Sequence, residues 1–198
     1  MTARAPIPAI LLAAGASRRL GRPKQLVEFQ GEALLARAVR MAREAGARPV
    51  LVVLGAHAEQ VRGVIPLPDS SIVLNADWQE GIASSIRAGL QAAEEHGFAV
   101  EGALLMTCDQ PRITAEHLAS LLRTFAQQSD PTIVASVYAG VRGIPAVFPR
   151  AVFPNLLALQ GDTGARGLLM NPPTALVEAR LEGGEIDIDE PADLAHLD

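Results

Sequence analysis

A short basic loop at residues 12–24 has the residue types that bind a polyvalent anion. Its sequence is Leu-Ala-Ala-Gly-Ala-Ser-Arg-Arg-Leu-Gly-Arg-Pro-Lys, and it follows an apolar run at 7–11 that is typical of a buried strand. A glycine-containing turn at a strand end exposes backbone N–H groups, and three arginines and one lysine add positive charge. The loop therefore predicts an anion site, and a nucleotide phosphate chain is the anion most often bound in this way.

The spacing of this loop excludes two well-known phosphate-binding motifs. A Walker loop has adjacent glycine and lysine followed by Ser or Thr, whereas two residues, Arg22 and Pro23, come before Lys24 here. The dinucleotide fingerprint needs Gly-x-Gly-x-x-Gly, and the loop offers Gly15 and Gly21 alone. A third kind of phosphate loop is therefore indicated.

An acidic residue, Asp109, follows the most apolar later run, 103–107, which is expected to be a central strand. Ligands bind at this edge of open α/β sheets, where a carboxylate is suited to hold Mg²⁺ on a triphosphate. The alternative is an aspartate that approaches a helix and binds nothing. Cys108 is interpreted as a small packed residue and not a nucleophile, because no histidine is near it in the sequence.

Apolar runs of strand length alternate with segments of helical period, which predicts an α/β fold with a mostly parallel central sheet and helices on both faces. Gly46 and Gly97 are expected to end helices, and Thr114 is expected to cap one. No repeat, linker or break in composition is present, so one domain, 1–198, is expected. The expected strands are 7–11, 49–54, 72–74, 103–107, 132–138, 144–148 and 174–179, and the expected helices are 34–45, 58–65, 82–96, 115–125, 153–159, 165–170 and 191–197.

Composition narrows the function classes. Aromatic residues make up only 4% of the chain, so the core is expected to consist of Ala, Val, Leu and Ile, and a net charge of −5 argues against a nucleic-acid partner. One cysteine fits a reducing compartment, and no apolar run approaches the ~20 residues that cross a bilayer. The stretch 7–14 is interrupted by Pro8 and runs into Arg18 and Arg19, unlike a signal peptide. We therefore expect a cytoplasmic protein with no membrane partner.

The first loop resembles the signature Leu-Ala-Ala-Gly-x-Ser-x-Arg-Met-Gly-x-x-Lys of a nucleotidyltransferase family, the molybdenum-cofactor cytidylyltransferases and their guanylyltransferase relatives. Leu20 replaces the usual Met, and Ala14 stands where the guanylyltransferases usually have a second glycine. Arg19 and Lys24 lie in a turn, where a long cationic side chain gains little from burial, so we expect them to act on the triphosphate and not on the fold. The resemblance implies that the nucleotide is bound here by Leu12, Ala13, Ala14, Gly15, Ser17, Arg19 and Lys24.

A second segment, 75–87, resembles the family pattern Asn-x-x-Trp-x-x-Gly-Met-x-Ser-Ser-Ile. The resemblance implies that the ribose or base of the nucleotide is contacted there. The alternative is a capping arrangement that serves only the following helix, with Trp78 as a packing residue. The further nucleotide-binding residues implied by this match are Asn75, Gly81, Ser84 and Ser85.

Three later segments also match the family. The glycine loops at 138–148 and 161–166 imply a site for a second anionic substrate, although Asp162 followed by Gly164 also makes an ordinary turn. The segment 186–194 resembles the closing pattern Asp-x-Asp-Thr-Pro-x-Asp-Leu, with Glu190 in place of Thr. It implies that Asp189 joins Asp109 as a metal ligand, and we expect the free carboxylates to repel each other. The implied acceptor-binding residues are Gly143, Pro145, Asp162, Gly164 and Arg166.

Together these matches imply a Rossmann-like nucleotidyltransferase fold and a defined reaction. CTP is the implied donor, the phosphate of molybdopterin the acceptor, and Mg²⁺, or Mn²⁺ in its place, the metal. Arg19, Lys24 and Asp109 are the implied catalytic residues. The implied protein partner is a molybdoenzyme of the xanthine-dehydrogenase type or its maturation factor. Two alternatives remain: transfer with GTP or to a sugar phosphate or other phosphorylated alcohol, and a carrier that binds a nucleotide or cofactor without chemistry.

Overall fold

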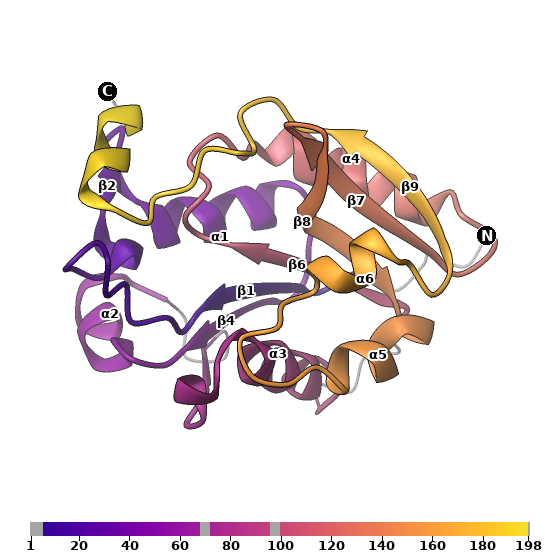
Figure 1. Cartoon of the computed structure of the whole chain (residues 1–198), viewed down its shortest axis with the longest axis horizontal. Coiled ribbons are helices and arrows are strands. Elements are labelled where there is room, and N and C mark those ends of the chain that lie inside the picture. The colour runs from indigo at the N-terminus through magenta and orange to yellow at the C-terminus, as the bar shows by residue number, and fades with distance from the viewer. Residues whose placement is uncertain (1–5, 68–71, 96–99, 198) are drawn as a thin grey trace.

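A mixed seven-stranded sheet is the centre of the fold in the computed structural model, which describes residues 6–67, 72–95 and 100–197 (Figure 1). The strand order is β5-β4-β1-β6-β8-β7-β9. β8 is antiparallel to both of its neighbours and the remaining pairs are parallel, so the mostly parallel sheet is confirmed. The strands are β1 (Ala9–Ala13), β4 (Val50–Leu54), β5 (Ile72–Leu74), β6 (Gly102–Thr107), β7 (Thr132–Tyr138), β8 (Val141–Pro149) and β9 (Ala175–Arg180).

Helices cover both faces of this sheet, because the central strands are apolar on both sides. In β1, Leu11 packs into the cluster beneath α1 (Leu34–Glu44) and α4 (Ala115–Ala126), whereas Ile10 and Leu12 pack into the cluster on the side of α3 (Ile82–Glu95) and α5 (Phe153–Leu157). Figure 1 shows these two layers of helices on opposite sides of the sheet. The shorter helices are α2 (Ala58–Val64) and α6 (Arg166–Met170). None of the helices in the described parts of the chain has the length and apolar character of a membrane span.

Several element boundaries differ from the prediction. β1 begins at Ala9, because Pro8 has no N–H to give to the sheet, and β8 extends beyond the expected 144–148 at both ends. The expected closing helix is a 3-10 helix, η5 (Pro191–Leu197). Thr114 does cap its helix, since its hydroxyl accepts the His117 N–H at 3.1 Å, and Gly46 has the positive φ, 94°, of a helix end. The expected cap Gly97 lies outside the described residues.

A small hairpin was not predicted. β2 (Glu28–Phe29) and β3 (Glu32–Ala33) pair around Gln30 and Gly31, whose φ values of 55° and 79° make a tight turn. Its Phe29 packs in a buried cluster that includes Leu20 and Ile188. The hairpin therefore packs against both the basic loop and the C-terminal segment, which lies beside it in Figure 1.

Gly89 is expected to tolerate no side chain. A Cβ built on this residue of α3 lies 2.3 Å from Ile10 Cγ2 in β1, and both residues are buried. We expect Gly89→Ala to cost ~1–3 kcal/mol through overpacking, which exceeds the gain of up to ~1 kcal/mol in helix propensity. Thermal unfolding should show a lower Tm. The matched control is Gly63→Ala in α2, where a Cβ meets nothing within 4 Å and stability should not fall. Equal Tm values for the two variants would contradict the packing argument.

Candidate active site

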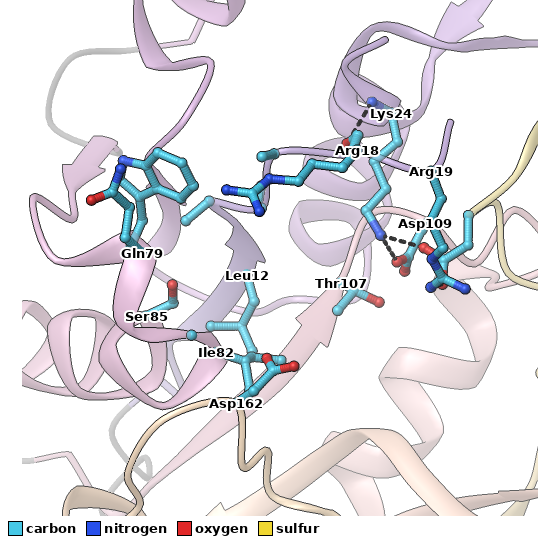
Figure 2. A pocket seen from close by; sticks show the side chains of 18 of the residues that line it. Leu12, Arg18, Arg19, Lys24, Gln79, Ile82, Ser85, Thr107, Asp109 and Asp162 are labelled. Atoms are coloured by element: carbon cyan, nitrogen blue, oxygen red, sulfur yellow. Dashed lines mark hydrogen bonds and ion pairs between the residues drawn. The ribbon is translucent and has the colours of Figure 1, made fainter. Parts of the chain in front are cut away.

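A cavity of about 590 Å³ opens at the carboxyl ends of β1 and β6, beside the start of α3 (Figure 2). This is the edge of an open α/β sheet at which ligands bind. The basic loop lines one side of it through residues 12–19 and Lys24, and the segment 78–82 lines another. Ser85, Thr107 and the carboxylates of Asp109, Asp162 and Asp189 complete the lining. The cavity thus combines backbone N–H groups, cations and carboxylates in one place.

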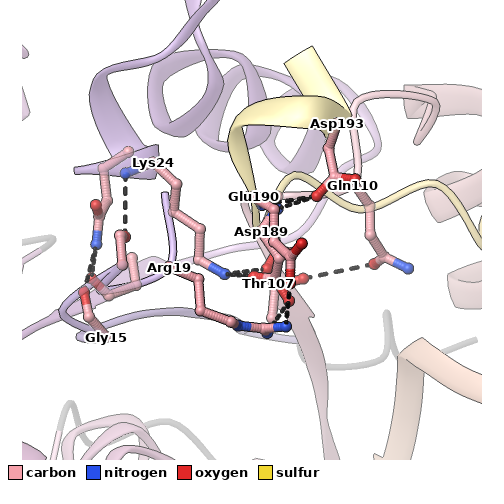
Figure 3. A network of polar contacts seen from close by, with 12 residues as sticks. Gly15, Arg19, Lys24, Thr107, Gln110, Asp189, Glu190 and Asp193 are labelled. Atoms are coloured by element: carbon pink, nitrogen blue, oxygen red, sulfur yellow. Dashed lines mark hydrogen bonds and ion pairs between the residues drawn. The ribbon is translucent and has the colours of Figure 1, made fainter. Parts of the chain in front are cut away.

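The basic loop is held in shape from beneath by Gln25. This side chain is 1% exposed, and its Nε2 donates to the carbonyl oxygens of Ala13 at 2.7 Å and Gly15 at 3.3 Å. Ser17 has a positive φ of 49°, and its Oγ accepts the Lys24 N–H at 3.1 Å, so its hydroxyl closes the loop (Figure 3). The loop conformation is therefore fixed by the chain's own bonds.

Lys24 lies between two carboxylates that are distant in the sequence (Figure 3). Its Nζ is 2.5 Å from Asp109 Oδ2 and 3.0 Å from Asp189 Oδ1. Arg19 Nη2 lies 2.7 Å from the other oxygen of Asp189, and its Nη1 lies 3.3 Å from Glu190 Oε1. The geometry therefore brings together Arg19, Lys24, Asp109 and Asp189, as the sequence predicts.

Two expectations about these residues are wrong. Lys24 does not project freely from a turn, because its side chain is only 20% exposed, whereas that of Arg19 is 65% exposed. Burial favours the neutral amine, but the charge and hydrogen bond of Asp109 outweigh it and raise the pKa of Lys24, so the ammonium persists. The two carboxylates consequently share a cation and do not face each other unscreened.

Asp189 reaches the site from a segment outside the sheet. It does not follow a strand of the sheet; the segment before it crosses the end of β6, where the Ile188 N–H donates to the Asp109 carbonyl at 2.9 Å. Ile188 is fully buried, and the Asp193 carboxylate accepts the N–H groups of Asp189 at 2.9 Å and Glu190 at 2.7 Å. A buried anchor and a capping carboxylate thus place Asp189 opposite Asp109.

The segment before α3 divides into cavity residues and supporting residues. Asn75 Nδ2 donates to Ser84 Oγ at 2.8 Å and Ser85 Oγ at 3.1 Å, while Ser84 Oγ donates to the Gly81 carbonyl at 2.8 Å. Asn75 and Ser84 are 7% and 4% exposed, so each provides a hydrogen-bond partner for the other beneath the segment 78–82, the wall of the cavity. Gly81 and Ser85 line the cavity. Asn75 and Ser84 therefore serve the start of α3, as in the alternative interpretation, although these bonds join side chains and the Gly81 carbonyl and do not cap helix N–H groups.

The expected acceptor-binding residues lie in three different places. Gly143, Gly164 and Arg166 line a second cavity, of about 370 Å³, whereas Asp162 lines the first. Pro145 lines neither of them; its carbonyl accepts the Ser136 hydroxyl inside the sheet at 2.6 Å. The two cavities share one lining residue, Ile82, and so adjoin each other.

Some lining residues were not assigned a role from the sequence. Arg18, Gln79, Glu80, Ile82 and Thr107 line the first cavity, and each stands at a variable position or beside a matched motif residue, so the patterns gave no signal for it. Trp78 lines the cavity too, in contrast to a pure packing role. It fits there because Gly55 leaves room: a Cβ on Gly55 would lie 2.6 Å from the Trp78 Cβ.

Cys108 has the environment of a packed residue. Its side chain is 3% exposed, and burial, with Asp109 next to it, raises the pKa of the thiol to about 12. A thiol with such a pKa is protonated at neutral pH. The site therefore contains no activated cysteine, in agreement with the sequence interpretation.

The carboxylate pair fits a hard divalent cation. Asp109 and Asp189 each place an oxygen on the same side-chain ammonium, so a single cation lies within reach of both. Mg²⁺ and Mn²⁺ prefer oxygen donors, and Mg²⁺ commonly uses one or two carboxylates with phosphate oxygens and water. Within the described part of the chain, no group of three or more His, Cys, Asp or Glu residues is placed to hold a metal. The donor set thus suits a cation that arrives with phosphate.

The family of the chain follows from the match of residues 9–177 to the model of the MobA-like NTP transferase domain. The chain belongs to this family and is a nucleotidyltransferase. Nicotine blue oxidoreductase of Paenarthrobacter nicotinovorans is 31% identical over 92% of each chain, and purine catabolism protein PucB of Bacillus subtilis is 30% identical over 92% of this chain and 91% of its own. A probable molybdenum cofactor guanylyltransferase of Opitutus terrae is 32% identical over 70% of this chain and 64% of its own.

Solved structures support the same assignment. The crystal structure of Rv0371c from Mycobacterium tuberculosis H37Rv superimposes with a TM-score of 0.84 and 31% identity, covering 97% of both chains. A second structure of that protein is a complex with manganese, with a TM-score of 0.80, 29% identity and the same coverage. The Rossmann-like nucleotidyltransferase fold predicted from the sequence is confirmed.

Proposed function

We propose that the protein, with 1–198 acting as one domain, transfers CMP from CTP to the terminal phosphate of molybdopterin and releases pyrophosphate. The observation that supports this most is the convergence of Lys24, Arg19, Asp109 and Asp189 at one end of the first cavity. A triphosphate needs cations and a metal at one point, and this cluster offers two cationic side chains and two carboxylates that would hold the metal. The relative named a molybdenum cofactor guanylyltransferase supports the choice of acceptor.

In the proposed reaction an oxygen of the acceptor phosphate attacks the α-phosphorus of CTP. A new P–O–P bond forms, the bond between the α-phosphorus and the bridging oxygen breaks, and pyrophosphate leaves with the electron pair. The acceptor phosphate is already ionised, so no protein nucleophile is needed, in keeping with the buried Cys108. The protein's task is to align two polyanions and to neutralise developing charge.

Each residue of the cluster has a proposed role in this task. Residues 12–15, Ser17, Gly81 and Ser85 bind the nucleotide, and Arg19 and Lys24 neutralise its phosphates. Asp109 and Asp189 would hold Mg²⁺, or Mn²⁺, which when bound supplies positive charge to the phosphate oxygens. Asn75 and Ser84 support the wall from beneath. The proposed acceptor site is the second cavity, with Gly143, Gly164 and Arg166 in its lining and Asp162 between the substrates.

The second candidate function is the same transfer with GTP in place of CTP, because the relative from Opitutus terrae is named a guanylyltransferase. The chain belongs to a transferase family, and this argues against the alternative function of a carrier that binds a nucleotide or cofactor without catalysing a reaction. We further propose that the protein works in the cytoplasm, without nucleic acid or membrane. Its proposed protein partner is a molybdoenzyme of the xanthine-dehydrogenase type, or the maturation factor of such an enzyme.

The direct test is incubation of purified protein with each of four nucleoside triphosphates and Mg²⁺, with and without molybdenum cofactor. We expect pyrophosphate release and a dinucleotide product with CTP and the cofactor together. Turnover with a sugar phosphate and not with the cofactor would overturn the choice of acceptor. Absence of turnover in every combination, with nucleotide binding intact, would overturn the proposed reaction.

CTP is expected to be preferred over GTP, and Ala14 is expected to contribute to that preference. Ala14 lines the cavity, and its carbonyl accepts the Ala56 N–H at 3.1 Å, so its methyl group is held in place. One methyl group changes selectivity by ~1–3 kcal/mol, or about 10–200-fold. A competition assay with both nucleotides should favour CTP, and Ala14→Gly should narrow the ratio. Ala16→Gly controls for added loop flexibility and should change the ratio less. Equal or better turnover with GTP in the unaltered protein would contradict the prediction.

A further inference from the structure

One polar cluster near the nucleotide cavity has no role in the proposed chemistry. Glu80, in the 3-10 turn Trp78–Glu80, pairs with Arg87 of α3 through its Oε2 and accepts the Gly161 N–H with its Oε1 at 3.2 Å. Arg87 Nη1 also donates to the Leu159 carbonyl at 2.7 Å. Two side chains thus bind the backbone of the segment 159–161 at two points.

The same segment touches the start of α3 directly. The Gly161 carbonyl accepts the Ala83 N–H at 3.2 Å, and a Cβ on Gly81 would lie 2.4 Å from that carbonyl oxygen. Gly81 has a φ of 122°, which also requires glycine. Backbone therefore rests on backbone at this point, and Glu80 and Arg87 flank the contact.

The segment held in this way connects the two cavities. Asp162 lines the first cavity next to the 78–82 wall, and Gly164, Ala165 and Arg166 line the second (Figure 2). Glu80 itself belongs to the turn that presents Trp78 and Gln79 to the nucleotide side. A displacement of 159–161 would therefore move one lining residue of the first cavity, Asp162, and three of the second, Gly164, Ala165 and Arg166, while the basic loop belongs to another segment.

We propose that Glu80 and Arg87 act together as positioning residues that fix the segment 159–166 and thereby set the affinity and alignment of the acceptor substrate. The identity of the acceptor rests on the proposed function, but the positioning role does not. The pair acts through the backbone of 159–161, so its loss affects the second cavity more than the nucleotide cavity. Because each side chain needs the other to be oriented, their effects are not additive.

The test compares Glu80→Ala, Arg87→Ala and the double variant with the unaltered protein. We expect the KM for the acceptor to rise about 10-fold or more in each single variant, because misplacement of a substrate-binding segment is costly. The double variant should be no worse than the worse single variant. CTP binding in the presence of Mg²⁺, followed by the fluorescence of Trp78, the single tryptophan, should change less than about 3-fold. Glu80→Gln, which keeps an acceptor for the Gly161 N–H, should give an intermediate KM.

The matched control is another ion pair of the same helix. Glu94 of α3 lies 3.0 Å from Arg150, and neither residue lines either cavity. Glu94→Ala should leave both the acceptor KM and CTP binding unchanged. An unchanged acceptor KM in folded Glu80→Ala and Arg87→Ala overturns the positioning role, as does an equal loss of CTP affinity.

Hydrogen–deuterium exchange separates this proposal from the proposed function. The Gly161 and Ala83 N–H groups should exchange faster in Glu80→Ala and Arg87→Ala than in the unaltered protein, and not in Glu94→Ala. If the unaltered protein does not turn over molybdenum cofactor, the proposed function fails while the exchange comparison still decides this one. Unchanged exchange at Gly161 in both variants overturns the positioning role.

Discussion

Asp109→Asn is expected to abolish nucleotidyl transfer, and Asp189→Asn to reduce it by at least ~100-fold, the loss typical of removing a transition-state charge contact. The carboxylate oxygens of Asp109 and Asp189 lie 2.5 Å and 3.0 Å from the Lys24 ammonium, so a divalent cation near that position would be within reach of both. An amide keeps the shape of the side chain but loses the charge that binds the metal. The expected loss is therefore in turnover and in metal dependence, with the fold retained.

Titration of Mg²⁺ and Mn²⁺ against rate measures this expectation. The concentration of metal at half-maximal rate should rise for Asp189→Asn, and no rate should be recovered for Asp109→Asn. Glu182→Gln is the control for loss of one carboxylate charge, because Glu182 pairs with Arg180 on the surface and lines neither of the two cavities. Its rate should stay near that of the unaltered protein. Unchanged rate and metal dependence in both site variants would remove the metal assignment.

The stability of Asp109→Asn is expected to fall slightly. If the two free carboxylates repelled each other, removing the charge of Asp109 would stabilise the fold. Lys24, however, lies between the two groups, and its side chain is only 20% exposed. The variant removes one partner of a largely buried cation. A lower Tm is the expected result, and a higher Tm would show that repulsion dominates after all.

Much of the fold was predictable because its central strands are continuous apolar runs. β4, β6 and β7 lie within one residue of their expected bounds, since strands covered on both faces are apolar on both faces. The hairpin of β2 and β3 was missed because two-residue strands are too short to show alternation. The reversed direction of β8 could not be inferred, because an apolar run has no sign of direction.

The sequence predicted which residues meet at the candidate site better than it predicted how they contact one another. The sequence patterns indicated Arg19, Lys24, Asp109 and Asp189, and the fold places them in one network. Two facts depend on packing between distant segments: the burial of Lys24 and the anchoring of Asp189 by Ile188. The division of the acceptor residues between two cavities depends in the same way on how 161–166 packs beside Ile82, the residue shared by the two linings, which replaces the Met of the family pattern.

Lys24→Ala is expected to lower turnover by at least ~100-fold. The change removes a cation from the proposed triphosphate site, and it removes the ammonium that pairs with both Asp109 and Asp189. Arg19→Ala should lower turnover by a similar factor. The two variants should differ in stability. Lys24 is largely buried and pairs with two carboxylates, so its loss should lower the Tm, whereas the exposed Arg19 should leave the Tm nearly unchanged.

The metal response separates charge neutralisation from a purely structural role of Lys24. In Lys24→Ala the two carboxylates lose their ammonium, so Mg²⁺ or Mn²⁺ should bind more tightly without nucleotide and raise the Tm by more than in the unaltered protein. Lys24→Arg, which keeps the charge, should show no such gain. A normal rate in folded Lys24→Ala would exclude the residue from the mechanism. An equal Tm increase by metal in all three proteins would show that the ammonium and the metal do not share a site.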